Sequence, residues 1–63
     1  MLYVVRHRNR GHFKASAPIA AALAVEAAVA LAAAGCSVTA TDDRGAPVDL
    51  EDLAEQVRRA AQG

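Results

Sequence analysis

The amino-acid sequence predicts an α+β fold, a small antiparallel sheet of two hairpins with two helices on one face. Two observations predict the hairpins, since residues 2–15 and 36–48 are both β-rich and both interrupted by a turn containing Arg-Gly. A third observation predicts the helices, because a helical pattern follows each segment, over residues 17–34 and again after Asp49. The expected order is ββαββα, or βαββα if the first hairpin is incomplete, in a single domain of 63 residues. The helices would bury the apolar face of the sheet.

The first hairpin is expected to have a three-residue loop. Residues 8–12, Arg-Asn-Arg-Gly-His, have the form of a type I turn that Gly11 closes in the left-handed conformation. In this register His7 pairs with Phe13, and paired residues share one face of the sheet. The expected apolar face is Tyr3, Val5, His7, Phe13 and Ala15, and the expected basic face is Arg6, Arg8, His12 and Lys14 beside Leu2 and Val4. The alternation of apolar residues and the positions of the charges then both predict that the basic face is exposed to water.

Residues 17–34 are expected to form the first helix. Ser16 can cap it, Pro18 lies in the first turn where a missing N–H costs nothing, and Gly35 is placed to end it. Its many alanines favour a helix in any case. Its large apolar residues point around most of the circumference, so the helix must be covered on several sides. We therefore expect an oligomer interface formed by Ile19, Leu23, Val25, Val29 and Leu31.

The second half of the chain has clearer local signals. Residues 36–41 are expected to form a strand, and the Asp-Asp-Arg-Gly turn at 42–45 leads into a short or edge strand that contains Pro47. Asp49 can cap the last helix, whose acids lie near its N-terminus and whose arginines lie near its C-terminus. Glu55 can pair with an arginine one turn later. The buried stripe of this helix is expected to be Leu50, Leu53, Ala54, Val57 and Ala61.

The size of the chain predicts that it oligomerises. A domain this short buries only about 60% of the surface that its unfolded form exposes, so its stability is marginal. Cys36 is the single cysteine, which excludes an internal disulfide and fits either a reducing compartment such as the cytoplasm or a small buried apolar residue. We expect a homodimer. No secretory signal is expected, because the apolar residues at the start precede the charges, and Glu26 argues against a spanning helix over residues 17–34.

The sequence offers little catalytic chemistry. His7, His12 and Cys36 are the only soft metal ligands, and the surrounding cations oppose a divalent ion. No phosphate-binding glycine loop and no acid/base pair stands out. We therefore expect no enzyme activity, no metal, no cofactor and no small-molecule substrate.

One short segment resembles an enzyme signature. Residues 3–7, Tyr-Val-Val-Arg-His, resemble the strand end of the histidine phosphatases, in which an Arg-His-Gly tripeptide supplies the nucleophilic histidine. Arg8 stands where that family has glycine, and no second histidine lies far downstream. We interpret the likeness as coincidental and expect His7 to be a partly buried residue opposite Phe13.

The charges are strongly segregated although the net charge is zero. Four cations precede Glu26, the first carboxylate, and a surface of one sign attracts partners of the other. The expected anion-binding residues are Arg6, Arg8, Arg10, His12 and Lys14. The first hypothesis is a small non-enzymatic regulator, such as an antitoxin-like factor or a phage-type inhibitor, that acts as a homodimer through protein–protein contact. The alternative is a nucleic-acid-binding protein whose basic hairpin contacts the phosphate backbone.

Overall fold

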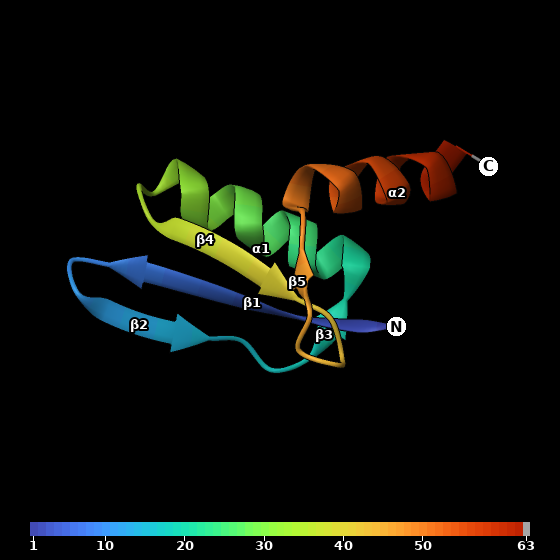
Figure 1. Cartoon of the computed structure of the whole chain (residues 1–63). Helices are drawn as coiled ribbons and strands as arrows, with labels where there is room; N and C mark the ends of the chain where they lie inside the picture. Colours follow the sequence, from blue (N-terminus) through green and yellow to red (C-terminus); the bar gives the residue numbers. More distant parts are fainter. Residues whose placement is uncertain (63) are drawn as a thin grey trace.

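The computed structural model describes residues 1–62 and confirms the α+β fold. A five-stranded antiparallel sheet has the strand order β2-β1-β4-β5, and β3 also pairs with β1 (Figure 1). The elements in chain order are β1 (Leu2–Asn9), β2 (His12–Ala15), β3 (Ile19–Ala20), α1 (Ala21–Ala33), β4 (Ser37–Thr41), β5 (Pro47–Val48) and α2 (Leu50–Gln62). Both predicted hairpins are present, and β3 is the additional element.

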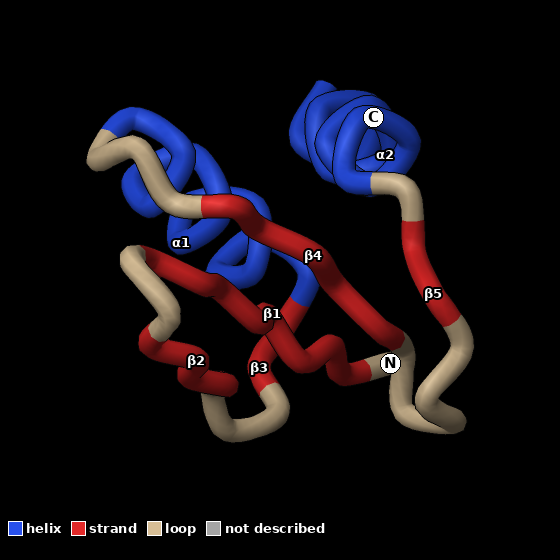
Figure 2. Tube along the Cα trace, turned by 60° about the vertical axis from the view of Figure 1, so that its left-hand side comes forward, coloured by secondary structure: helices blue, strands red, loops and turns tan. Residues whose placement is uncertain are grey.

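Both helices contribute to a core on one face of the sheet (Figure 2). Tyr3 and Val5 of β1 are buried there against Ala24 of α1 and Leu53 of α2. Within residues 1–62, the large side chains that are almost completely buried are Val5 and Leu53. The core is therefore small, and no helix or strand of the described chain covers the opposite face of the sheet.

The first turn differs from the expected three-residue loop. Asn9 pairs with His12, so the loop is the two-residue Arg10-Gly11. Both residues have positive φ, 50° for Arg10 and 82° for Gly11, as a type I′ turn requires. Such turns match the right-handed twist of the flanking strands, and the sheet adopts one although an arginine takes the left-handed position.

The shorter loop moves β2 by one residue and exchanges its faces. Arg8 pairs with Phe13 and Arg6 with Ala15, so Phe13 and Ala15 share the face of the arginines. His7 pairs with Lys14, which contradicts its expected position opposite Phe13. The predicted basic face is therefore wrong for β2, because His12 and Lys14 belong to the face of Tyr3 and Val5.

The start of α1 also differs from the prediction. The helix begins at Ala21, after Ile19 has paired with Tyr3 in the sheet and packed against the core. Ser16 does not cap it. Its hydroxyl accepts a hydrogen bond from the Val5 N–H at 3.0 Å, and its own N–H donates to the Val5 carbonyl at 2.8 Å. Ser16 thus bridges β2 and β3 along one edge of β1, and the extra residue there returns Ile19 to the buried face.

The predicted end of α1, the second turn and the cap of α2 are confirmed, whereas Ala61, which was expected in the buried stripe of α2, is exposed. Gly35, at φ 90°, ends α1 with its N–H on the Ala32 carbonyl, and the next N–H reaches the Leu31 carbonyl, both at 3.0 Å. In the second turn the carboxylate of Asp42 accepts two backbone N–H groups at 2.9 Å. Asp49 caps α2 by accepting the N–H of Glu51 at 2.9 Å. Neither helix within residues 1–62 has the length and apolar character needed to cross a bilayer.

Candidate partner-binding surfaces

The first candidate surface is the uncovered side of the sheet, which we call the open face. Alternation along the strands and the observed pairings define its members. They are Leu2, Val4, Arg6 and Arg8 of β1, Phe13 and Ala15 of β2, and Ser37, Thr39 and Thr41 of β4. The open face carries two arginines and no carboxylate among these residues.

Phe13 lies directly beside the arginines on the open face. The hydrogen bond from the Ser16 N–H to Val5 marks these two as a hydrogen-bonded pair. Because the two kinds of pair alternate, Arg8 and Phe13 form a non-hydrogen-bonded pair, the kind with Cα atoms about 4.5 Å apart and closer side chains. Phe13 is 65% exposed. An aromatic ring and two guanidinium groups therefore share one small area.

The other predicted cations surround this area without belonging to the open face. Arg10 lies at the tip of the turn, and His12 and Lys14 lie on the opposite face of β2. All three are exposed. The five predicted anion-binding residues thus make the hairpin end basic on both faces, and only Arg6 and Arg8 combine with an aromatic side chain.

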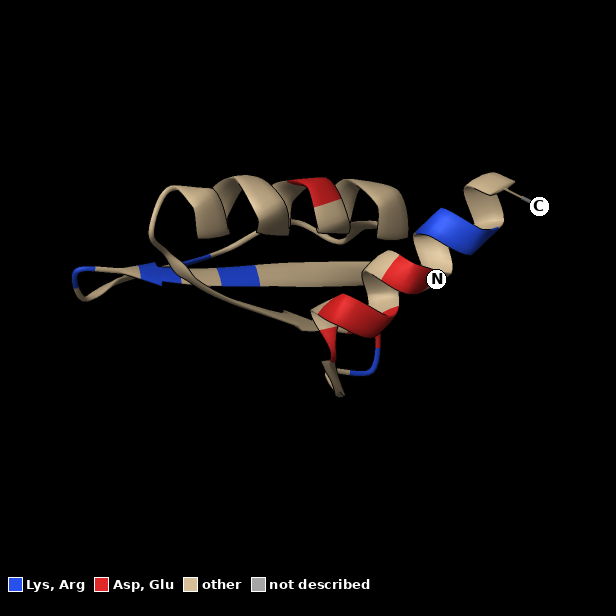
Figure 3. Cartoon of the chain, turned by 90° about the horizontal axis from the view of Figure 1, so that it is seen from above, with Lys and Arg blue, Asp and Glu red and all other residues tan. Residues whose placement is uncertain are grey.

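The hairpin cations have no ion-pair partner within residues 1–62. Both ion pairs of the described chain belong to α2, where Glu55 contacts Arg58 and Arg59. Figure 3 shows the hairpin cations at one end of the molecule and most of the acids toward the other, on α2 and the turn before it. The charge segregation of the sequence is therefore also a segregation in space, and the hairpin charge is available to a partner.

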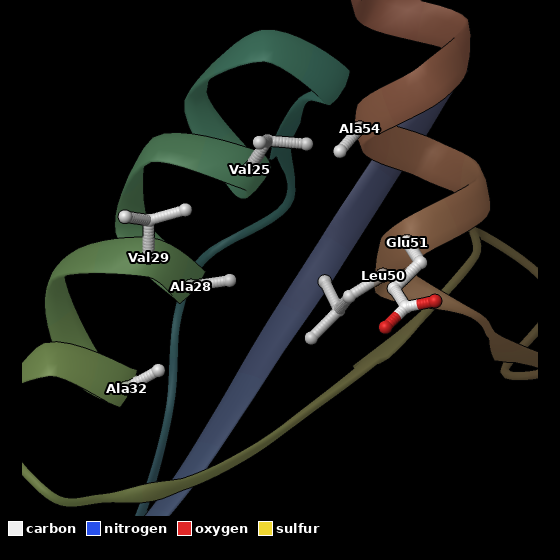
Figure 4. Close-up of a pocket in the computed structure, with 7 residues that line it drawn as sticks. All are labelled: Val25, Ala28, Val29, Ala32, Leu50, Glu51 and Ala54. Atoms are coloured by element: carbon white, nitrogen blue, oxygen red, sulfur yellow. The ribbon is translucent and has the colours of Figure 1, made fainter.

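The second candidate surface is a groove between α1 and α2 with a volume of about 250 Å³ (Figure 4). Its lining is apolar except for one carboxylate at the rim. The lining residues are Val25, Ala28, Val29 and Ala32 of α1, and Leu50, Glu51 and Ala54 of α2. The small side chains of α1 leave this space open.

The structure divides the predicted oligomer interface. Ile19, Val25 and Leu31 pack against the core, whereas Leu23 and Val29 are 54% and 64% exposed. The exposed pair lies six positions apart along the chain, so the two side chains point about 120° apart on a helix of 3.6 residues per turn. Val29 borders the groove and Leu23 does not. The five residues therefore do not form one continuous surface.

The residues considered for chemistry, His7, His12 and Cys36, lie toward the turn end of β1 and on, or directly before, the strands beside it. Cys36 is a half-buried free thiol just after α1, and His7 is half-buried on β1. In the described part of the chain, no three side chains of His, Cys, Asp or Glu lie close enough to hold a metal ion. The geometry therefore offers two surfaces for binding, the open face and the apolar groove.

Sequence reasoning missed Phe13 as a surface residue, and one signal could have found it. A residue followed by glycine between two alternating segments is also the pattern of a two-residue hairpin. Reading Arg10-Gly11 in this way places Phe13 on the arginine face. A three-residue loop would not need an arginine at positive φ, but in the structure Arg10 has a φ of 50°.

Comparisons with protein-family models, with curated proteins and with solved structures find no match to this chain. The functional interpretation therefore depends on the geometry of the two surfaces.

Proposed function

We propose that this protein is a small, non-enzymatic binding protein that acts as a homodimer through protein–protein contact. In this proposal the helical layer joins two copies, and the open face of each copy holds an anionic partner. The single cysteine supports a reducing compartment such as the cytoplasm for this protein.

The observation that carries the proposal is the position of the two surfaces. The apolar groove lies in the helical layer, and the arginines lie on the side of the sheet that the helices leave uncovered. Two copies that meet through their helices would therefore keep both open faces accessible. A binding protein needs this separation, because assembly and partner binding then do not compete.

The packing supports a second copy as the occupant of the groove. The core holds few large buried side chains, and a small domain gains stability when an apolar surface is buried between subunits. Val29 borders the groove and is exposed, so a two-fold axis near this residue would place it in the groove of the other copy. The alanines of α1 permit close approach of the two helices.

Size-exclusion chromatography with light scattering tests the proposal. We expect the wild-type protein at about twice the monomer mass of 6.5 kDa. The variant Val29→Asp should be monomeric, because it places a charge in the groove. Leu23→Asp is the matched control, with the same charge on the same helix away from the groove, and it should remain a dimer. A monomeric wild type, or a dimer that survives Val29→Asp, would contradict the proposal.

A further inference from the structure

We propose that the open face binds single-stranded nucleic acid, with Phe13 stacking on a base and with Arg6 and Arg8 contacting phosphates. This inference goes beyond the proposed function, because it names nucleic acid as the anionic partner of the open face, and it rests on that function in leaving the open face free in the assembled protein. The proposal depends on the aromatic ring of Phe13 together with the charges of Arg6 and Arg8, and neither feature alone would indicate nucleic acid.

The exposed ring is the first step. A single exposed apolar side chain is ordinary, so its exposure alone indicates nothing. Phe13, however, is directly paired with Arg8 and lies on the same face as Arg6. Every base has a π-face, so an exposed ring beside cations forms a stacking platform that tolerates any sequence. Phe13 therefore selects a partner that has both flat apolar groups and negative charge.

The spacing of the arginines is the second step. Arg6 and Arg8 alternate along one strand, which places their Cα atoms about 6.6 Å apart. This separation is comparable with the step between neighbouring phosphates of an extended single strand. Thr39 pairs with Arg6 and Ser37 with Arg8, so an exposed hydroxyl lies beside each arginine. These hydroxyls can donate to or accept from sugars and base edges.

The exposed Phe13 ring favours single-stranded over double-stranded nucleic acid. Bases of a duplex are stacked and paired, so they present no free face to an aromatic side chain. The open face is also part of a sheet, and no helix or ribbon projects from it to enter a groove. An acidic protein could pair with the arginines, but it would have no use for the ring. The combination favours nucleic acid over an acidic protein.

The other hairpin cations, Arg10 and Lys14, make the electrostatic potential near the hairpin more positive, although they do not belong to the open face. Arg10 lies at the turn, and Lys14 lies on the face opposite the arginines. Their charges attract a polyanion toward the hairpin end, where no carboxylate pairs with the described cations. Lys14 therefore provides a matched control, since its removal changes the charge as much as removal of Arg8 does.

Fluorescence anisotropy with labelled oligothymidine and oligouridine at low and moderate salt tests the proposal. We expect wild-type protein to bind both oligonucleotides, and to bind an annealed duplex more weakly. Phe13→Ala should weaken binding by about 5- to 150-fold, the range measured for loss of one stacking side chain. Phe13→Leu should weaken it similarly although the apolar bulk remains. Arg8→Ala should reduce the salt slope by about 0.7, whereas Lys14→Ala should change it less.

Circular dichroism with thermal unfolding verifies that each variant is folded. No binding at low salt, or equal binding by wild type and folded Phe13→Ala, would overturn the proposal. Equal effects of Arg8→Ala and Lys14→Ala would also overturn it, because binding would then depend on general charge. Binding to polyglutamate that does not need Phe13, without binding to oligonucleotides, would assign the open face to an acidic protein.

The two proposals fail separately. A monomeric protein that binds oligonucleotide through Phe13 would contradict the homodimer and support the open face. A stable dimer that binds no oligonucleotide would support the homodimer and contradict nucleic-acid binding by the open face. Val29→Asp should therefore be measured in the same titration, and we expect it to retain Phe13-dependent binding.

Discussion

The N-terminal hairpin and the C-terminal helix α2 use the same residue type in opposite ways. In α2, Arg59 Nε lies 3.3 Å from Glu55 Oε1, and Arg58 contacts the same carboxylate. These arginines also lie toward the negative end of the helix. The hairpin cations are Arg6, Arg8, Arg10 and Lys14. They have no ion-pair partner in the described chain, and they do not lie at the end of a helix.

This difference shows that clusters of arginine need separate interpretation. Local structure accounts for the charges of α2, whereas no ion pair within residues 1–62 involves the hairpin cations. Arg10 even occupies a left-handed conformation that costs an ordinary residue about 1 kcal/mol. A basic segment that its own fold does not use is the better candidate for a partner. Three substitutions test the comparison, in order of decreasing effect.

The largest effect is expected at Leu53, the buried anchor of α2. Leu53→Ala should lower the free energy of unfolding by about 2 to 5 kcal/mol, because it leaves a cavity beside Val5 and Tyr3. Urea unfolding followed by circular dichroism measures the change. Leu23→Ala makes the same substitution at an exposed position of α1 and should cost less than about 0.5 kcal/mol. Equal losses in the two variants would contradict the anchoring of α2 by Leu53.

The next effect is expected at Ser16, which holds the edge of the hairpin. Ser16→Ala removes the acceptor of the Val5 N–H in a partly buried position and should cost about 1 to 3 kcal/mol. Faster hydrogen exchange at the Val5 amide would locate the loss. Ser37→Ala is the control, because Ser37 is exposed on β4. If Ser16→Ala leaves both stability and exchange unchanged, the bridge between β2 and β3 does not stabilise the sheet.

The smallest effect is expected at Arg10, and it is stabilising. Asparagine tolerates the left-handed conformation and forms the preferred Asn-Gly turn, so Arg10→Asn should add about 0.5 to 1 kcal/mol. A change of 1 kcal/mol raises the Tm of a domain this small by about 4 to 8 °C in a thermal scan. Arg44→Asn is the matched control, since Arg44 also precedes a glycine but is not at positive φ. A Tm no higher than that of the wild type would show that Arg10 is unstrained.

The elements that could be predicted have strong local signals. Gly35 ends α1, the side chain of Asp42 organises the second turn, and Asp49 caps α2. Each depends on residues within a few positions along the chain, so the sequence carries the information directly. The candidate site could be predicted in part, because Arg6 and Arg8 were expected on one face. Phe13 was expected on the other face, because the first turn was interpreted as a three-residue loop.

The sequence by itself determined the α+β order, the positions of the two turns, the second helix and the basic character of the first hairpin. Tertiary structure decided the register of β2, the start of α1 at Ala21 and the side on which Phe13 lies. These depend on whether Arg10 accepts a positive φ and whether Ile19 reaches the core beside Tyr3. Such choices differ locally by about 1 kcal/mol, and the pairing and packing of the whole sheet outweigh them.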